Sequence, residues 1–399
     1  MSVRAHRAAA GMRRRSCLLL VGFLGVAFSW SLLTAANAQL FETKAAQAFM
    51  VDAETGTVLF SKDADKLLQP GSLAKLMTME VTFEAIKAGR LKLDDTFVVS
   101  ENAWRTGGAP SGTSTMFAKI KSTLTLEELI QGVTVQAAND GCIVIAEGMS
   151  GSEANFALQM TERARKLGLG NSTFVNSTGL PADGQQTTVR DLTLLALHIW
   201  RDYPDLYRYF GGMDFTWNKI SQRNRNPLLA MDMGADGLAV GASEQSGFGI
   251  VGSASQRGKR VVAAMSGLSS DRERAEEARK LLEWGLRAFD KTEIFADGEV
   301  VGEAEVFGGA EATVPLKAKG PVDIFLPISN RDKLKARIVY AGPLKAPVEE
   351  GQPVGSLRIW IGDTLSQETP LFAARTVDIG TLPNRALDAM KELAIGWLR

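Results

Sequence analysis

Histidine and cysteine are almost absent from this sequence, since each occurs only twice in 399 residues. Beyond the first 38 residues only His198 and Cys142 remain, and both lie in apolar stretches that indicate core or helix-end positions. One histidine argues against a Ser-His-Asp triad, and one cysteine cannot form an intramolecular disulfide. The two residues also lack the ligand spacing of a zinc site. We therefore expect no metal and no cofactor.

A surplus of charge of either sign is also missing. The chain has 45 basic and 45 acidic residues, and 45% of its residues are hydrophobic. The absence of a basic surplus argues against nucleic acid as a partner. The length and composition suit a globular protein of two or three domains with a sizeable core.

The first 38 residues are typical of a secretory signal peptide. They contain five arginines and no acidic residue, followed by an apolar run from Cys17 to Thr34 and the small-residue exit Ala36-Asn37-Ala38. We predict cleavage before Gln39 and export to the periplasm; a retained membrane helix is the alternative. Without this segment, 40 basic residues would face 45 acidic ones.

The pattern from residue 39 to about 290 predicts a domain of mixed helices and strands. Apolar runs around a turn indicate a hairpin over residues 47–60, and residues 236–266 are typical of β structure. Thr125 and Glu128 form a capping box that starts a helix near Leu126. Further helices are expected over residues 72–87, 141–149, 152–167, 188–200 and 273–289. This order indicates the α+β class.

Residues 291–381 predict a small all-β domain, because short apolar runs alternate with Gly-Gly and Gly-Pro turns. The expected strands are Val300–Phe307, Ala312–Lys317, Val322–Ile328, Leu334–Tyr340, Ser356–Ile361 and Leu371–Val377. An amphipathic helix over residues 382–399 closes the chain. It is a candidate for contact with the surface of the inner membrane, or it packs on the β domain.

Ser72 and Lys75 are the candidate catalytic pair. A serine hydrolase without histidine needs another base, and a neutral lysine can serve. At a spacing of three residues, the two side chains share one helix face. Ser72 follows Pro70-Gly71 at the start of the helical pattern, where free backbone N–H groups favour developing negative charge.

The surrounding motifs resemble the D-alanyl-D-alanine carboxypeptidases, the low-molecular-mass penicillin-binding proteins of peptidase family S11. The similar segments are residues 52–59 and 69–78, Val135–Asp140, Asn176–Leu180 with Thr188–Leu192, Asn224–Asn226, and Asp236–Ser253. The resemblance covers residues 45–290, and the β-rich part is similar to the family's second domain. It implies a penicillin-binding, serine β-lactamase-like transpeptidase fold.

The resemblance also implies roles for individual residues. Ser72 is the nucleophile that forms the acyl-enzyme, and Lys75 accepts its proton. Asn139 orients Lys75 and binds the substrate backbone, and the backbone N–H groups of Ser72 and Ala242 form the oxyanion hole. The strand that binds the substrate carboxylate corresponds to Ala239-Val240-Gly241. The implied ligands are peptidoglycan stem peptides, with β-lactam antibiotics as acylating ligands.

Two of the family's three motifs are altered here. Ala137 stands where the family has a loop serine, and Ala239-Val240-Gly241 stands where it has Lys-Thr-Gly. The strand lysine and threonine bind the terminal carboxylate, and the lysine charge helps to lower the pKa of the active lysine. Two hypotheses follow: an active carboxypeptidase with altered carboxylate recognition, or an impaired member that binds peptidoglycan or a partner protein. A β-lactamase is a third, but no glutamate is placed for deacylation.

Overall fold

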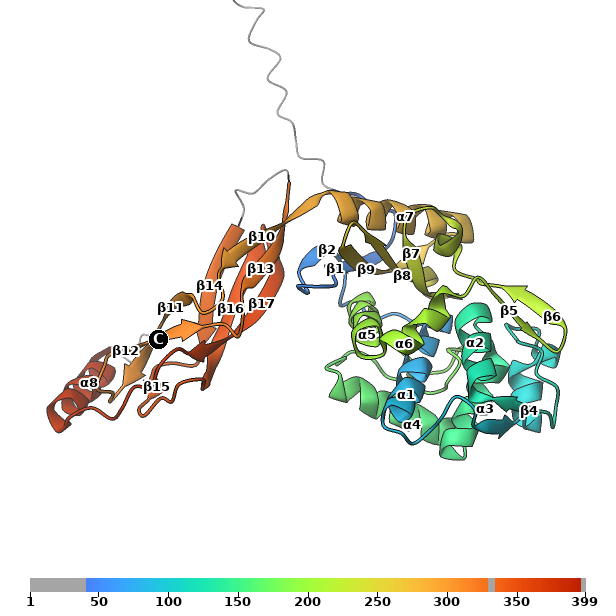
Figure 1. The fold of residues 1–399 in the computed structure, drawn as a ribbon, viewed down its shortest axis with the longest axis horizontal. Coiled ribbons are helices and arrows are strands. Elements are labelled where there is room, and N and C mark those ends of the chain that lie inside the picture. The colour runs from blue at the N-terminus through green and yellow to red at the C-terminus, as the bar shows by residue number, and fades with distance from the viewer. Residues whose placement is uncertain (1–40, 329–333, 396–399) are drawn as a thin grey trace, which may run out of the picture. The chain divides into compact units, whose positions relative to one another are not determined.

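The computed structural model describes residues 41–328 and 334–395 (Figure 1). The expected signal peptide, with Cys17, lies outside these residues, as do residues 396–399 of the expected C-terminal helix. Mixed helices and strands are followed by a domain of strands, which confirms the predicted fold class.

A five-stranded antiparallel sheet, in the order β2-β1-β9-β8-β7, forms the centre of the first domain. Its strands are β1 (Gln47–Asp52), β2 (Val58–Lys62), β7 (Ala235–Ser243), β8 (Gly247–Gln256) and β9 (Lys259–Leu268). The hairpin expected at 47–60 is thus confirmed. Its turn is held by Asp52, whose Oδ1 accepts from the N–H groups of Glu54 and Thr55.

Helices cover both faces of this sheet, with α7 on one face and α5 on the other (Figure 1). The alternation of side chains along β1 explains how both faces are filled. Met50 lies against Gly285 of α7, whereas Phe49 lies under Arg190 of α5. Every residue of β1 is buried as a result.

The helices of the first domain mostly begin at side-chain caps. They are α1 (Lys75–Lys87), α2 (Leu126–Gln136), α3 (Asn139–Ser150), α4 (Glu153–Lys166), α5 (Val189–Asp202), α6 (Pro204–Tyr207) and α7 (Asp271–Arg287). The capping box of Thr125 and Glu128 is present as predicted, and Ser152, Thr188 and Ser270 cap α4, α5 and α7.

The structure corrects the start of the helix that carries the candidate pair. Residues Gly71–Ala74 form a 3-10 helix, η1, and α1 begins only at Lys75. Gly71 has a φ of +52°, and an added Cβ would lie 2.3 Å from the carbonyl oxygen of Ala242. This close approach of η1 to β7 places Ser72 in a tight turn beside the edge of the sheet.

The second domain is built from strands, as expected, and has its own apolar core. A six-stranded sheet has the order β14-β16-β17-β12-β11-β15, and β10 pairs with β13. The strands are β10 (Phe289–Phe295), β11 (Val300–Phe307), β12 (Thr313–Lys317), β13 (Val322–Pro327), β14 (Leu334–Tyr340), β15 (Leu344–Lys345), β16 (Pro353–Ile361) and β17 (Thr364–Ala373).

The predicted ends of one strand in this domain and of the helix before it are wrong. The last strand is expected at 371–377, but β17 ends at Ala373, because it forms a hairpin with β16 around Gly362. The helix expected to reach residue 289 ends at Arg287, and Phe289 begins β10.

The remaining elements are short, apart from α8. They are β3 (Thr96–Val98), β4 (Thr123–Thr125), β5 (Asp214–Trp217), β6 (Ile220–Arg223), η2 (Ala103–Gly107), η3 (Ala109–Ser111), η4 (Arg208–Gly211), η5 (Pro227–Ala230) and α8 (Leu382–Ile395).

Among the described residues, no helix combines the length and the apolar character that crossing a membrane requires.

Candidate active site

Ser72 and Lys75 line a small cavity beside β7, and Ser72 also lines a second, larger cavity there. The Nζ of Lys75 donates a hydrogen bond to the Oγ of Ser72 at 2.9 Å, and another to the carbonyl oxygen of Thr178. Lys75 is only 4% exposed. The pair expected from the sequence is therefore in contact, with the lysine withdrawn from solvent.

Burial lowers the pKa of Lys75 to about 8, and the positive charge of Arg225 lowers it as well. Negative charge on Cys142 and Glu153 would oppose this shift. Burial raises the pKa of Cys142 to about 12, so that thiol is uncharged at neutral pH. A lysine with a pKa of about 8 has about one tenth of its molecules neutral at pH 7, which is far more than an ordinary lysine.

The loop between α2 and α3 brings Ala137 to the same cavity, and the buried Asn139 follows two residues later. Ala137 has a φ of +55° and ends α2, and Asn139 begins α3. The side-chain amide of Asn139 donates to the Oγ1 of Thr113 at 2.9 Å, and its N–H donates to the carbonyl oxygen of Ser114. Within the described residues the Oδ1 of Asn139 has no partner, and the expected contact with Lys75 is not among its hydrogen bonds.

The edge strand β7 forms the opposite wall. Val240, Gly241 and Ala242 line a cavity of about 520 Å³ together with Ser72 and Ala137. An added Cβ at Gly241 would lie 2.9 Å from the backbone nitrogen of Leu73. A glycine at this position therefore lets the strand approach the turn that carries Ser72. Positions 239 and 240 bring only a methyl and an isopropyl group to this wall.

Two arginines that we did not single out from the sequence also line this cavity. Arg274 lies in the first turn of α7, pairs with Asp271 at 2.6 Å and has a side chain only 8% exposed. Its Nε is buried without a partner among the described residues, and an Nη reaches the carbonyl oxygen of Gly241 at 3.5 Å. Burial lowers the pKa of Arg274, and the charge of Arg225 acts in the same direction. Arg225, Arg274 and its partner Asp271 thus line one cavity.

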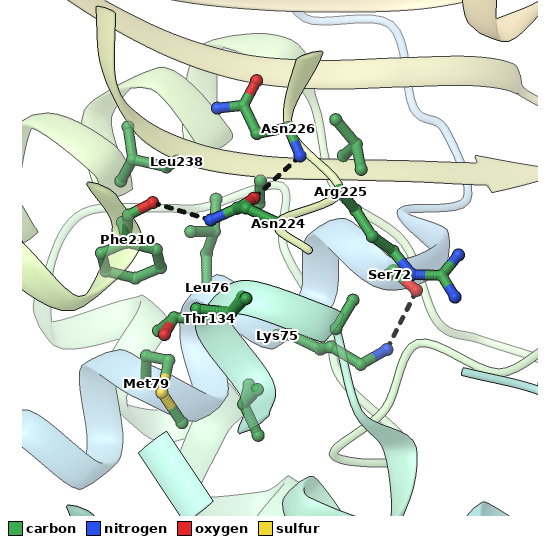
Figure 2. A pocket seen from close by; sticks show the side chains of 15 residues that line it. Ser72, Lys75, Leu76, Met79, Thr134, Phe210, Asn224, Arg225, Asn226 and Leu238 are labelled. Atoms are coloured by element: carbon green, nitrogen blue, oxygen red, sulfur yellow. Dashed lines mark hydrogen bonds between the residues drawn. The ribbon is translucent and has the colours of Figure 1, made fainter. Parts of the chain in front are cut away.

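Arg225 is the second of these arginines, and its neighbours hold it in place. The side-chain amide of Asn224 donates to the carbonyl oxygens of Gly212 and Phe210, and its Oδ1 accepts from the N–H of Asn226. Figure 2 shows Lys75 pointing toward Ser72, with the guanidinium of Arg225 directed to the same part of the cavity. The sequence indicated that Asn224-Arg225-Asn226 resembles a family segment, but not that the Arg225 side chain points into the cavity. Arg274 had no signal that separates it from the other arginines of its helix.

The described residues contain no group of three or more His, Cys, Asp and Glu side chains that could hold a metal ion. The one histidine among them, His198, lies in α5 with its Nδ1 2.9 Å from Asp202 and its Nε2 3.3 Å from the buried Glu80.

Family comparison assigns this architecture to the serine-type carboxypeptidases. Residues 33–269 match the model of the D-alanyl-D-alanine carboxypeptidases of peptidase family S11, and residues 289–378 match the C-terminal domain of penicillin-binding protein 5. The chain belongs to the D-alanyl-D-alanine carboxypeptidase family, as its sequence motifs predicted.

Individual relatives extend over both domains. The chain is 36% identical to the D-alanyl-D-alanine carboxypeptidase DacC of Escherichia coli, over 85% of this chain and 86% of that protein. It is 31% identical to DacA of the same organism, over 87% of each chain. The crystal structure of penicillin-binding protein 5 from Haemophilus influenzae matches with a TM-score of 0.72 and 29% identity, over 85% of this chain and 99% of that one.

Proposed function

We propose that this protein removes the terminal D-alanine of peptidoglycan stem peptides through an acyl-enzyme on Ser72. The observation that carries the proposal is the 2.9 Å hydrogen bond between Ser72 and a buried Lys75 whose pKa is lowered to about 8. A β-lactam antibiotic would acylate the same serine; a relative from Listeria monocytogenes, penicillin-binding protein D2, has been crystallised with ampicillin bound.

The reaction follows from the positions of these groups. Neutral Lys75 takes the proton of the Ser72 hydroxyl as Oγ attacks the carbonyl carbon between the two D-alanines. Ser72 and Ala242 line one cavity, and their backbone N–H groups are the proposed donors to the oxyanion. The C–N bond then breaks, Lys75 returns its proton to the departing amine, and an ester remains on Ser72. Lys75 then takes a proton from water as the water attacks the ester, and returns it to the Oγ of Ser72 as the shortened peptide leaves.

Arg274 is our candidate for the carboxylate-binding group that positions 239 and 240 lack. It is buried, lines the cavity beside Ser72 and has an Nε with no partner among the described residues. A charge-assisted hydrogen bond to a carboxylate contributes about 1.5–3 kcal/mol. A guanidinium also offers two parallel N–H groups to a carboxylate, which a lysine cannot.

Replacing Arg274 by glutamine is expected to lower kcat/KM for a peptide ending in D-Ala-D-Ala by about 10- to 100-fold, which corresponds to the loss of one such interaction. The same peptide with a C-terminal amide is the control, because it carries no carboxylate for Arg274 to bind. The variant should therefore lose the preference for acid over amide. Equal losses on both peptides would mean that Arg274 only supports the structure.

Two assays on the unaltered protein test the proposed function. We expect release of D-alanine from diacetyl-L-Lys-D-Ala-D-Ala, and covalent labelling by a fluorescent penicillin. The second candidate, a member of the family that binds peptidoglycan without cutting it, is favoured by Ala137, Ala239 and Val240. Sedimentation with peptidoglycan, with neither D-alanine release nor labelling between pH 6 and 10, would decide for that candidate.

The proposed site of action is the periplasm. The supporting observation is the expected signal peptide over residues 1–38, together with a substrate that lies outside the inner membrane. The helix α8 is the proposed contact with the membrane surface, since Leu382 and Met390 are exposed.

A further inference from the structure

Ala239 leaves the wall beside Lys75 without the cation that the family's strand lysine would supply. We propose that Arg225, which lies in a segment that resembles the family, is the cation that remains: its guanidinium is the fixed positive charge that favours the neutral, proton-accepting form of Lys75. Arg225 is thus a positioning residue that acts through Lys75. The inference rests on the proposed function, because it concerns the same pair of residues.

The cavity between Lys75 and β7 provides the geometry. Among the described residues that line it, Lys75 and Arg225 are the charged ones, and most of the others are apolar, including Leu76, Val133 and Leu238 (Figure 2). Ala239 lines the same cavity. Apolar surroundings strengthen the interaction between two charges, so a cation here acts on Lys75 more strongly than it would across water.

The chain holds Arg225 in this position from both sides. The N–H of Arg225 donates to the carbonyl oxygen of Val135 at 3.1 Å, at the end of α2. Asn224 is fixed by its amide bonds to the backbone near Gly212, and the buried Asn226 caps the next turn. The backbone of Arg225 is therefore held beside the cavity.

The charge of Arg225 is not neutralised by a neighbour. Within the described residues it forms no ion pair. An Nη group instead donates to the side-chain oxygen of the uncharged Gln136 at 3.0 Å. In this orientation of the amide, its nitrogen also donates a hydrogen bond, to the carbonyl oxygen of Arg223. The positive charge is therefore available to act on Lys75, whose pKa it lowers, and on Arg274.

The other groups that face Lys75 do not supply a positive charge. They are the hydroxyl of Ser72, the carbonyl oxygen of Thr178, the thiol of Cys142 on α3 and the carboxylate of Glu153 on α4. Glu153 raises the pKa of Lys75, although its carboxylate also accepts from the N–H and hydroxyl of Ser177. Burial and Arg225 are what lower the pKa of Lys75, and of these two Arg225 is a single side chain that can be replaced.

The test is the pH dependence of acylation by a fluorescent penicillin in Arg225→Gln, Arg225→Lys and the unaltered protein. We expect the rate to rise with pH through about 8 in the unaltered protein. Arg225→Gln should move this midpoint upward, and each unit of movement lowers the rate at pH 7 about tenfold. Arg225→Lys, which keeps the charge, should retain most of the original midpoint. Arg274→Gln is the matched control: it removes a cation from the second cavity beside Ser72, which Lys75 does not line, and is expected to weaken binding with little movement of the midpoint.

Two further variants separate electrostatics from structure. Adding Ala239→Lys to Arg225→Gln should return the midpoint toward 8, because it restores a cation to the same wall. Gln136→Glu places a carboxylate against Arg225, which should neutralise its charge and raise the midpoint although Arg225 is present. This variant replaces Arg225→Gln as the test if Arg225→Gln does not fold. An unmoved midpoint in Arg225→Gln, or in Gln136→Glu where the former is unfolded, overturns the inference.

The pKa of Lys75 can also be read without acylation, by NMR titration of ¹³Cε-lysine-labelled protein, with the signal assigned in Lys75→Met. If the unaltered protein is never acylated, the proposed function fails, and this titration still decides the role of Arg225. A Lys75 pKa that is equal in the unaltered protein and Arg225→Gln would refute it.

Discussion

Replacement of Ser72 by alanine is expected to abolish covalent labelling by a fluorescent penicillin and to reduce D-alanine release to background. The Oγ of Ser72 is the oxygen that Lys75 contacts, at 2.9 Å. Without it no ester can form, and removal of the nucleophilic serine costs on the order of 10⁶-fold in kcat in a well-studied serine protease. Gel fluorescence and the mass of the intact protein measure the loss.

Ser114→Ala is the matched control for this result. Ser114 lines the same cavity but lies on the segment that precedes α2, and its carbonyl oxygen, which bonds to Asn139, remains in the variant. Labelling should persist there, and peptide mapping should place the adduct on Ser72. An adduct that survives in Ser72→Ala would show that another side chain is the nucleophile.

Gly179→Ala is expected to cause a large loss of stability in the first domain. Gly179 has a φ of +81°, and an added Cβ would lie 1.7 Å from the carbonyl oxygen of Gly71. The left-handed backbone costs about 1–2 kcal/mol for a residue with a side chain. The clash forces the backbone apart and adds about 1–3 kcal/mol. Because Thr178 and Gly71 flank the pair, penicillin labelling should fall as well.

Gly168→Ala isolates the contact from the backbone strain. Gly168 has a φ of +77°, close to that of Gly179, but nothing lies within 4 Å of an added Cβ. Urea unfolding should therefore show a loss of only about 1–2 kcal/mol for this control. Equal losses in the two variants would mean that the turn at Gly71 relaxes around the methyl group without cost.

Local sequence patterns predicted helix and strand ends correctly where those ends depend on residues close together in the chain. The capping box at Thr125 and Glu128 marked the start of α2 correctly, since its bonds lie within four residues. The strands 300–307 and 334–340 were predicted at their actual ends, because apolar runs meet turn residues there. The end of β17 was misplaced, because its pairing with β16 decides where that strand lies.

The first turn of the active-site helix shows the limit of periodicity. The apolar pattern from Ser72 onward favoured one continuous helix, yet Gly71–Ala74 form a 3-10 turn. The close approach of β7, more than 160 residues later in the chain, accompanies this turn: Gly71 and Gly241 both lie where a side chain would collide with the opposite backbone. No local sequence pattern carries that contact.

The sequence by itself determined the family, the Ser72–Lys75 pair and the absence of a lysine at 239, because these depend on residue identity and short spacing. Only the tertiary structure decided which cations lie beside the pair. Arg225 and Arg274 are 49 positions apart, and both are far from Ser72 in sequence. They line one cavity because α7 begins beside the end of β7, where Arg274 reaches the carbonyl oxygen of Gly241, and the backbone of Arg225 is bonded to Val135 at the end of α2. The positive charge of Arg225 then lowers the pKa of Lys75 through space, although the two residues are 150 positions apart in the sequence.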